Sequence, residues 1–289
     1  MSGASLLKKR ILGFIRIIRP INGLMMSLAV FVGAWLSINV PVSPHLLYKL
    51  LLGALTAFTL SGASMAINDY CDYEIDKINE PDRPLPSGIV KLEESLLLAA
   101  TMVLIGLVAS SLINLKTLLL ALISIVVSTI YAFRGKQTGL LGNMLVSFCV
   151  AIPFIYGSFI VSDAIDLKIL LFSMMAFLSN TGREVTKGIV DVSGDRAKNI
   201  RTVAVVYGEE VAATVASAMI LSAVILSIVP PVISIVSAWF IPFVAVTDAG
   251  FILSSVMLIR NPTRQNARKI KSLILACMLM GMIAFIAGK

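Results

Sequence analysis

The sequence predicts an all-α integral membrane protein whose transmembrane helices bundle around a central cavity with a polar cytoplasmic mouth. Its 289 residues are 58% hydrophobic and 14% charged, whereas soluble domains average about 45–50% apolar and about 25% charged residues. Apolar runs of about 18 residues or more recur along almost the whole chain, which is the length that a helix needs to cross a bilayer. Helices also satisfy all their backbone hydrogen bonds internally, as the hydrocarbon core requires.

Nine candidate spans follow from these runs, and we expect them to form a single transmembrane domain over residues 1–289. The run after Pro20 is too long for a signal peptide and lacks a clear cleavage site, so it is interpreted as an uncleaved first span. The expected spans cover about 21–38, 46–68, 91–113, 117–133, 139–161, 167–186, 208–229, 232–259 and 267–287.

The basic residues predict how the chain crosses the cell membrane. With the N-terminus in the cytoplasm, most of the 24 Lys and Arg residues lie in inward-facing segments, as the positive-inside rule requires. The outer side then keeps only Lys49, Lys116, Lys168 and Lys289. We therefore expect a multi-pass protein of the lipid bilayer with a cytoplasmic N-terminus, cytoplasmic polar loops and an outer C-terminus.

Composition also argues against several functions. His45 is the only histidine, which excludes histidine metal sites and histidine-based catalytic triads. The three cysteines are scattered without CxxC spacing, so neither a disulfide framework nor a zinc site is expected. No segment is long enough to build a basic soluble surface for nucleic acid, and no obligatory protein partner is evident.

The stretch from Ala66 to Gly88 follows the second span and is the most acidic part of the chain. Asp69, Asp72 and Asp76 are spaced i, i+3 and i+7, so on a helix they would fall within an arc of roughly 60°. Such carboxylates repel one another, by about 0.2–0.5 kcal/mol for an exposed pair, and a hard cation such as Mg²⁺ would relieve the repulsion. The alternative is a solvated connector, because three prolines and a glycine mark a turn-rich loop.

A second polar stretch, residues 180–208, follows the sixth span and carries Asp191 and Asp195, which share a face if the stretch is helical. Two aspartate-rich loops, about 68–90 and 183–207, thus reach the cytoplasmic side, and a third inward loop adds Arg134 and Lys136. Acids that hold metal ions and bases that hold phosphoryl oxygens suit a Mg²⁺–polyphosphate substrate. A cavity made of membrane helices would bind a hydrophobic chain. A prenyl diphosphate has such a chain at one end and a polyphosphate at the other, so it fits both parts of the site.

These residues carry a resemblance to a known family. Asn68–Asp76 reads NDxxDxxxD and Asp191–Asp195 reads DxxxD, and both are similar to the paired aspartate motifs of the UbiA superfamily of intramembrane prenyltransferases. The resemblance covers nearly the whole chain. RPIN near the start and DYEIDKINEPDRPLPSG look most like the archaeal digeranylgeranylglyceryl phosphate synthases. The tail AKNIRTVAVVYG departs from them, because many members carry a glycine just before the Arg-Thr.

The resemblance implies Mg²⁺-dependent transfer of a geranylgeranyl group from geranylgeranyl diphosphate to the hydroxyl of geranylgeranylglyceryl phosphate, releasing pyrophosphate, in ether-lipid synthesis. The expected partners are a prenyl diphosphate and a membrane-resident acceptor lipid. The expected catalytic residues are Asp69, Asp72, Asp191 and Asp195, which with Asp76 would bind the metal. Substrate would be bound by Asn22, Asn68, Arg83, Tyr131, Arg134, Lys136, Arg183 and Lys187.

The two anionic substrate groups need separate bases, because a monophosphate and a diphosphate on shared metals would repel each other strongly. We assign Lys187 and Arg83 to the diphosphate, and Arg134 with Lys136 to the acceptor phosphate. Two other functions stay open: prenylation of an aromatic acceptor, such as a quinone precursor or haem, and transport of an ion or phosphate. Asp248, inside the eighth expected span, either lines the cavity or is a hydrogen-bonded packing residue.

Overall fold

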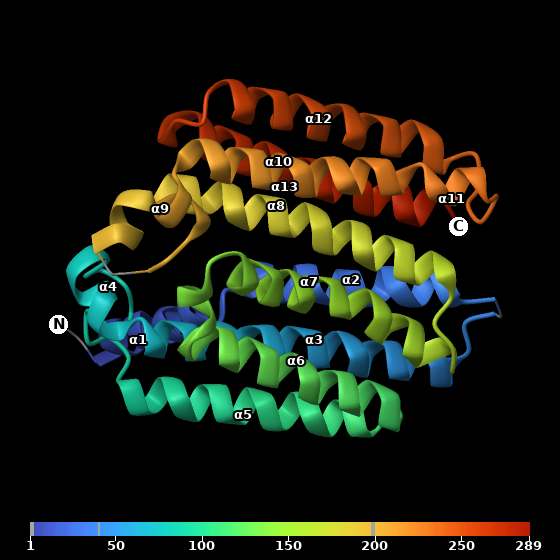
Figure 1. The fold of residues 1–289 in the computed structure, drawn as a ribbon. Coiled ribbons are helices and arrows are strands. Elements are labelled where there is room, and N and C mark those ends of the chain that lie inside the picture. The colour runs from blue at the N-terminus through green and yellow to red at the C-terminus, as the bar shows by residue number, and fades with distance from the viewer. Residues whose placement is uncertain (1–2, 40, 198–199) are drawn as a thin grey trace. The chain divides into compact units, whose positions relative to one another are not determined.

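A computed structural model describes residues 3–39, 41–197 and 200–289, and within these ranges the chain forms helices and connecting turns without any strand (Figure 1). The chain divides into two compact units. The first unit comprises residues 1–31 and 41–133, and the second comprises residues 32–40 and 134–289.

The first unit contains α1 and most of α2, followed by a long helix, a short one and two further spans. Their bounds are α1 Gly3–Ile18, α2 Pro20–Ser37, α3 Pro44–Cys71, α4 Tyr73–Asn79, α5 Leu92–Ser111 and α6 Leu115–Phe133. Helices α3, α5 and α6 pack against one another. Small residues permit this approach: the Thr56 hydroxyl donates to the Gly106 carbonyl at 3.1 Å, and the Ser64 and Ser128 hydroxyls lie 2.9 Å apart.

The second unit is built around α8, which packs against α7, α10 and α13. Its elements are the 3₁₀ turn η1 Gly135–Thr138 and helices α7 Leu140–Val161, α8 Leu167–Ala197, α9 Val203–Tyr207, α10 Glu209–Ser227, α11 Val229–Val232, α12 Phe240–Arg260 and α13 Arg264–Ala287. Ile189, Ile220, Leu258 and Ile274 are fully buried in its core. Phe172 stacks on Phe285 with 4.0 Å between the ring centroids, which joins α8 to α13.

Eight of the described helices are long and apolar enough to cross a membrane: α2, α3, α5, α6, α7, α10 continued into α11, α12 and α13. The protein is therefore a multi-pass membrane protein, as the composition predicts. The sixth expected span lies in α8, whose second half is polar. The count of nine spans stays a prediction.

Both aspartate stretches were expected to be loops, and the structure shows that they are largely helical. Helix α3 continues to Cys71 and α4 follows from Tyr73, while α8 runs unbroken to Ala197. The physical reason lies in the absence of breakers: the first proline after Pro44 is Pro81, and residues 167–197 contain no proline. The i, i+4 relation of Asp191 and Asp195 therefore does place them on one face of a helix.

Candidate active site

The first-motif cluster, which comprises Arg19, Asn68, Asp69, Asp76 and Arg83, forms where α3 gives way to α4. Helix α3 ends at Cys71, and Asp72 keeps a nearly helical backbone with φ −87° and ψ 0° before α4 begins. The Asp76 N–H donates to the Asp72 carbonyl at 2.8 Å. Helix-type hydrogen bonds thus continue through Asp72, although α4 turns away from the axis of α3 (Figure 1).

Asp69 and Asp76 are buried, and each is paired with an arginine. Arg19 Nη2 donates to Asp69 Oδ1 at 2.7 Å, and Arg83 Nη1 donates to Asp76 Oδ2 at 2.6 Å. Arg19 joins α1 to α2 with a positive φ of 47°, an uncommon conformation for a residue with a side chain. Buried carboxylates require such partners, because an unpaired charge away from water is costly.

Arg83 lies in the turn between α4 and α5, outside the spans. Its partial burial disfavours the charged guanidinium, but attraction to Asp76 and the hydrogen bond with it outweigh that effect. The pKa of Arg83 is therefore raised above its ordinary value. We predicted that Arg83 binds the diphosphate; the structure shows it bonded to Asp76, and its role toward substrate stays a prediction.

Asn68 provides the strongest sign of a ligand in the first unit. Its Oδ1 atom is buried and finds no hydrogen-bond partner within the described part of the chain, a situation that is rare in folded proteins. Asn68 directly precedes Asp69 in the sequence and lies four residues before the half-buried Asp72. Hard cations bind such oxygens, so the residues fit a metal ion.

No group of three or more His, Cys, Asp or Glu side chains that could hold a metal ion occurs among the described residues. Mg²⁺ usually keeps several waters and takes one or two carboxylates together with substrate phosphates. An amide oxygen with one or two aspartates is therefore a sufficient protein contribution, which Asn68 with Asp69 or Asp72 would supply.

The second-motif cluster lies on α8 and comprises Arg183, Glu184, Lys187, Asp191 and Asp195. Glu184 lies between the two bases and accepts from Arg183 Nη1 at 3.0 Å and from Lys187 Nζ at 3.4 Å. Arg183 Nε is buried without a hydrogen-bond partner among the described residues. Asp191 and Asp195 are half-buried one turn further along. An unsatisfied guanidinium N–H on the same helix as two carboxylates suits a phosphate that is shared with a metal ion.

One further predicted residue, Asn22, extends the first-motif cluster through Met65, a residue that was not predicted. The Asn22 amide nitrogen lies 3.8 Å from Met65 Sδ, and Arg19 Nη1 lies 3.4 Å from the same sulfur. Asn22 is exposed. The structure therefore brings Asn22 to the side of the Arg19–Asp69 pair, as a substrate-contacting role requires.

The remaining predicted residues lie around the 3₁₀ turn η1. Tyr131 is half-buried near the end of α6, Arg134 is exposed at the start of the turn, and Lys136 is half-buried within it. Gly139 ends the turn with φ 62°, and a side chain there would come within 2.9 Å of the Arg201 carbonyl. The turn is thus held close to the segment that follows α8.

The structure gathers the predicted residues into separate groups. The first-motif cluster belongs to one unit, while η1 and the second-motif cluster belong to the other. Convergence of the two aspartate motifs on one cavity stays a prediction. Sequence reasoning missed Arg19 and the clamping role of Glu184. The available signals were that buried Asp69 needs a base, and that Glu184 lies one residue after Arg183 and three before Lys187.

Asp248 has a plain structural setting. It accepts a hydrogen bond from the Ser227 hydroxyl at 2.7 Å, which links α12 to α10. This contact agrees with the interpretation of Asp248 as a hydrogen-bonded packing residue.

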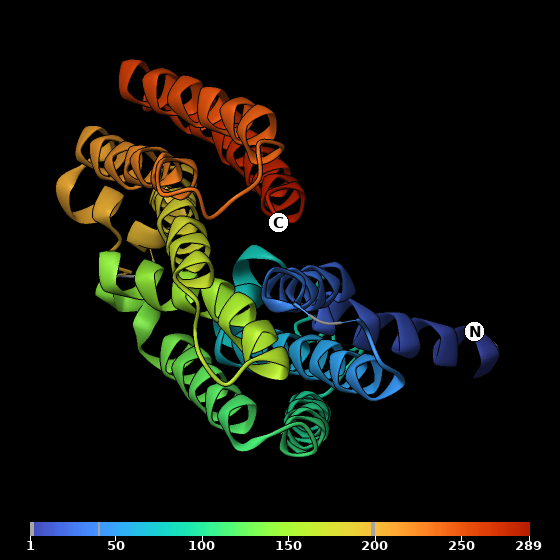
Figure 2. The same ribbon diagram turned by 90° about the vertical axis from the view of Figure 1, so that its right-hand side faces the viewer.

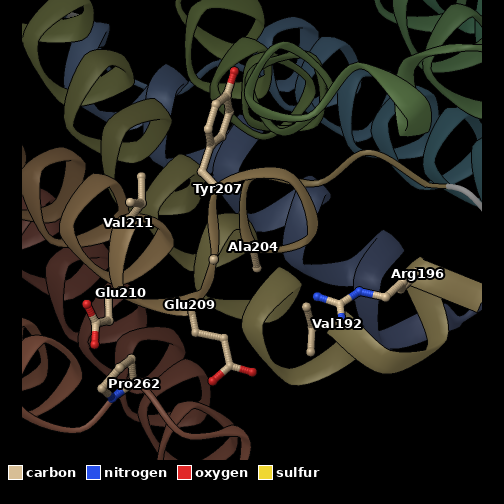
Figure 3. A pocket seen from close by; sticks show the side chains of 9 residues that line it. Val192, Arg196, Ala204, Tyr207, Glu209, Glu210, Val211 and Pro262 are labelled. Carbon is tan, nitrogen blue, oxygen red and sulfur yellow. The ribbon is translucent and has the colours of Figure 1, made fainter.

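A cleft of about 470 Å³ lies beside the second-motif cluster, where the end of α8 meets α9 and the start of α10 (Figure 3). Val192 and Arg196, each directly after one of the motif aspartates, line one side. Residues one apart on a helix differ by about 100° in direction. The cleft therefore opens on the face of α8 next to that of Asp191 and Asp195.

Comparison with known proteins supports one family over nearly the whole chain. The model of the UbiA prenyltransferase family matches residues 26–283. The digeranylgeranylglyceryl phosphate synthase of Archaeoglobus fulgidus is 36% identical, covering 94% of this chain and 93% of that protein. The protein of the same name from Methanosphaera stadtmanae is 30% identical, covering 95% of this chain and 98% of that protein.

Solved structures agree with this assignment. A structure of digeranylgeranylglyceryl phosphate synthase matches with a TM-score of 0.81 at 28% identity and covers 96% of this chain and 98% of that chain. A UbiA homologue from Archaeoglobus fulgidus bound to GPP and Mg²⁺ has a TM-score of 0.68 at 18% identity, covering 94% of this chain and 99% of that chain, and shares the fold. The predicted all-α membrane fold and the family resemblance are both confirmed. The chain therefore belongs to the UbiA prenyltransferase family and is a membrane-embedded prenyltransferase.

Proposed function

We propose that this protein transfers a geranylgeranyl group from geranylgeranyl diphosphate to the hydroxyl of geranylgeranylglyceryl phosphate and releases pyrophosphate. The observation that carries the proposal is the near-full-length likeness to relatives that share one name, at 36% identity over 94% of this chain for the first of them. Family membership supports prenyl transfer, and the name of these relatives supports the acceptor.

Mg²⁺ is the proposed cofactor. On the first unit the proposed ligands are Asn68, Asp69 and Asp72, and on the second unit they are Asp191 and Asp195. When bound, the ion neutralises charge that develops on the departing diphosphate. Asn68 Oδ1, which has no hydrogen-bond partner among the described residues, is the feature of this chain that supports the site. Asp76 was also predicted as a ligand; one of its oxygens accepts from Arg83, and its role toward the metal stays a prediction.

The bases of α8 have a defined task in this proposal. Arg183 and Lys187 donate to oxygens of the diphosphate, while Glu184 holds both side chains in position. Arg183 would do so through Nε, which has no partner within the described part of the chain. The bond between the prenyl C1 and the diphosphate oxygen breaks, and pyrophosphate departs with the electron pair. Charge-assisted hydrogen bonds strengthen as negative charge builds on that oxygen, which lowers the barrier.

The acceptor hydroxyl oxygen then forms the new bond to C1 and gives up its proton to the released pyrophosphate. The allylic cation that develops at C1 needs only a weak nucleophile, so no strong general base is required. Exclusion of water by the surrounding helices protects the cation from hydrolysis.

Arg134 and Lys136 are the proposed site for the acceptor phosphate. They lie on or beside η1, on a segment separate from both aspartate motifs. Separate bases are required because the two anionic groups repel each other. An acceptor without an anionic group would have no use for this pair.

The proposed orientation places the N-terminus and both motifs at the cytoplasmic side of the cell membrane and the C-terminus outside. Under this topology, a cysteine introduced at exposed position 82 faces the cytoplasm and one introduced at exposed position 163 faces outward. A membrane-impermeant maleimide should therefore label position 82 only in inside-out vesicles and position 163 only in right-side-out vesicles. Labelling of position 82 from the outside of intact cells would show that the topology is the reverse of the proposed one.

The function is tested with the full chain in nanodiscs, labelled geranylgeranyl diphosphate and a panel of acceptors. We expect pyrophosphate release and a diprenylated product with geranylgeranylglyceryl phosphate, and no product with hydroxybenzoate or a naphthoate. Turnover of an aromatic acceptor alone would establish the first alternative. Ion or phosphate flux through reconstituted vesicles without any prenyl transfer would establish the transporter, which family membership disfavours.

A further inference from the structure

Helix α1 has one face that packs on the first unit and another that is exposed. On the packed face, Gly13 lies so close to Ile89 and Val90 that a methyl group there would come within 2.9 Å and 3.0 Å of their side chains. Ile17 is completely buried on the same face. The guanidinium of Arg10 also points inward, because it is bonded to Glu94. This contact fixes how α1 is rotated.

The exposed face of α1 is apolar. Its large side chains remain accessible to about half of their surface: Leu7 61%, Ile11 52%, Leu12 49% and Ile15 43%. At 100° per residue these four fall within an arc of roughly 140°. The exposed Lys8 falls inside the same arc, between Ile15 and Leu12. Four large apolar side chains left uncovered around it form an apolar stripe and mark a surface that contacts another apolar phase or partner.

Every charge on α1 is positive. Lys8, Lys9 and Arg16 are exposed, and residues 3–18 contain no Asp or Glu. Lys9 and Arg16 lie on one flank of the apolar stripe, within about 20° of each other on the helix circumference. An apolar stripe with a basic edge is complementary to a layer that has an apolar interior and a negatively charged surface.

The direction of α1 matches such a surface. Figure 2 shows α1 lengthwise while α5 of the same unit is seen end-on, so α1 lies across the direction of the span. A helix that lies across the spans runs along the plane of the membrane. Its end at Ile18 adjoins Arg19, which contacts Asp69.

We propose that α1 is an in-plane membrane helix that binds anionic lipid. Leu7, Ile11, Leu12 and Ile15 enter the boundary between headgroups and acyl chains, and Lys8, Lys9 and Arg16 bind lipid phosphate groups. Helices of this type seat their apolar face about 5–10 Å deep and respond to the content of anionic lipid. Anionic lipid is thereby held on the surface of the first unit next to Arg19. The proposal is independent of which acceptor the enzyme uses.

The first test determines, in the full chain, whether the apolar stripe of α1 contacts lipid and its basic flank contacts water. A fluorophore is attached at Ile11→Cys or, as the matched control, at Lys9→Cys, with Cys71, Cys149 and Cys277 replaced by alanine and the protein reconstituted in vesicles. We expect the probe at position 11 to be quenched by spin-labelled acyl chains and shielded from aqueous iodide. The probe at position 9 should show the reverse. Equal access of iodide to both positions would overturn the proposal, and so would shielding of position 11 from both quenchers, which would indicate a protein partner or a second copy.

The second test concerns charge. Vesicles of phosphatidylcholine alone are compared with vesicles that contain about one quarter phosphatidylglycerol, a content sufficient to attract basic residues at the surface. Quenching at position 11 by acrylamide, an uncharged aqueous quencher, should fall several-fold when the anionic lipid is present, and Lys8→Gln, Lys9→Gln and Arg16→Gln together should abolish that difference. Identical quenching in both vesicle types for the unsubstituted helix would refute lipid binding by the bases. Far-ultraviolet circular dichroism of each variant checks that it is folded.

Discussion

Replacing Arg83 with glutamine should destabilise the first unit, because Arg83 neutralises a buried carboxylate. Arg83 Nη1 lies 2.6 Å from Asp76 Oδ2, and the two side chains are 37% and 7% exposed. Removing one partner from a fully buried pair costs about 3–5 kcal/mol, whereas exposed pairs contribute about 0–1 kcal/mol. Water screens the exposed third of Arg83, so we expect an intermediate loss of about 2 kcal/mol. The melting temperature should fall by about 4–8 °C.

The assay is a double-mutant cycle in detergent, with melting followed for Arg83→Gln, Asp76→Asn and the pair together. Residues in direct contact couple by about 0.5–3 kcal/mol, so the double variant should lose less than the two single losses combined. Lys77→Gln is the matched control, because Lys77 pairs with Glu74 at 3.0 Å on the exposed surface, and no measurable change is expected. If Arg83→Gln melts normally and only raises the donor KM, then Arg83 binds diphosphate and the structural reasoning is refuted.

Three further outcomes are expected. Asp191→Asn should remove most activity with little change in melting temperature. Near-normal turnover of this variant at saturating Mg²⁺ would show that Asp191 is not a ligand. EDTA should abolish wild-type activity until Mg²⁺ is restored. Lys136→Ala should raise the acceptor KM about tenfold, the loss of one charge-assisted contact, while Gln137→Ala leaves it unchanged; a rise in donor KM instead would place the turn on the diphosphate. Gly182→Ala should cost about 1–3 kcal/mol, because its methyl group would come within 2.5 Å of Ile220 and 2.7 Å of the Ala216 carbonyl. Gly194→Ala on the same helix meets nothing within 4 Å, so equal melting losses for both glycines would contradict this packing.

The second motif shows where sequence reasoning succeeded and where it stopped. The spacing of Asp191 and Asp195 predicted a shared face on condition that the stretch is helical, and α8 meets that condition. The same stretch was expected to be a loop because its polar residues obscure the apolar periodicity that identifies helices. Burial of Val185 and Ile189 on the opposite side is what keeps this polar half helical.

The sequence by itself determined the class of the protein, the places of most spans, the two aspartate motifs and the family. Hydrophobic length and motif spacing are properties of neighbouring residues, so they can be read along the chain. Only the tertiary structure decided which base serves which acid: Arg19 reaches Asp69 across 50 positions, and Asn68 Oδ1 is left without a partner among the described residues. These outcomes depend on how helices pack, because burial sets the cost of an unpaired charge and brings distant residues within hydrogen-bonding distance.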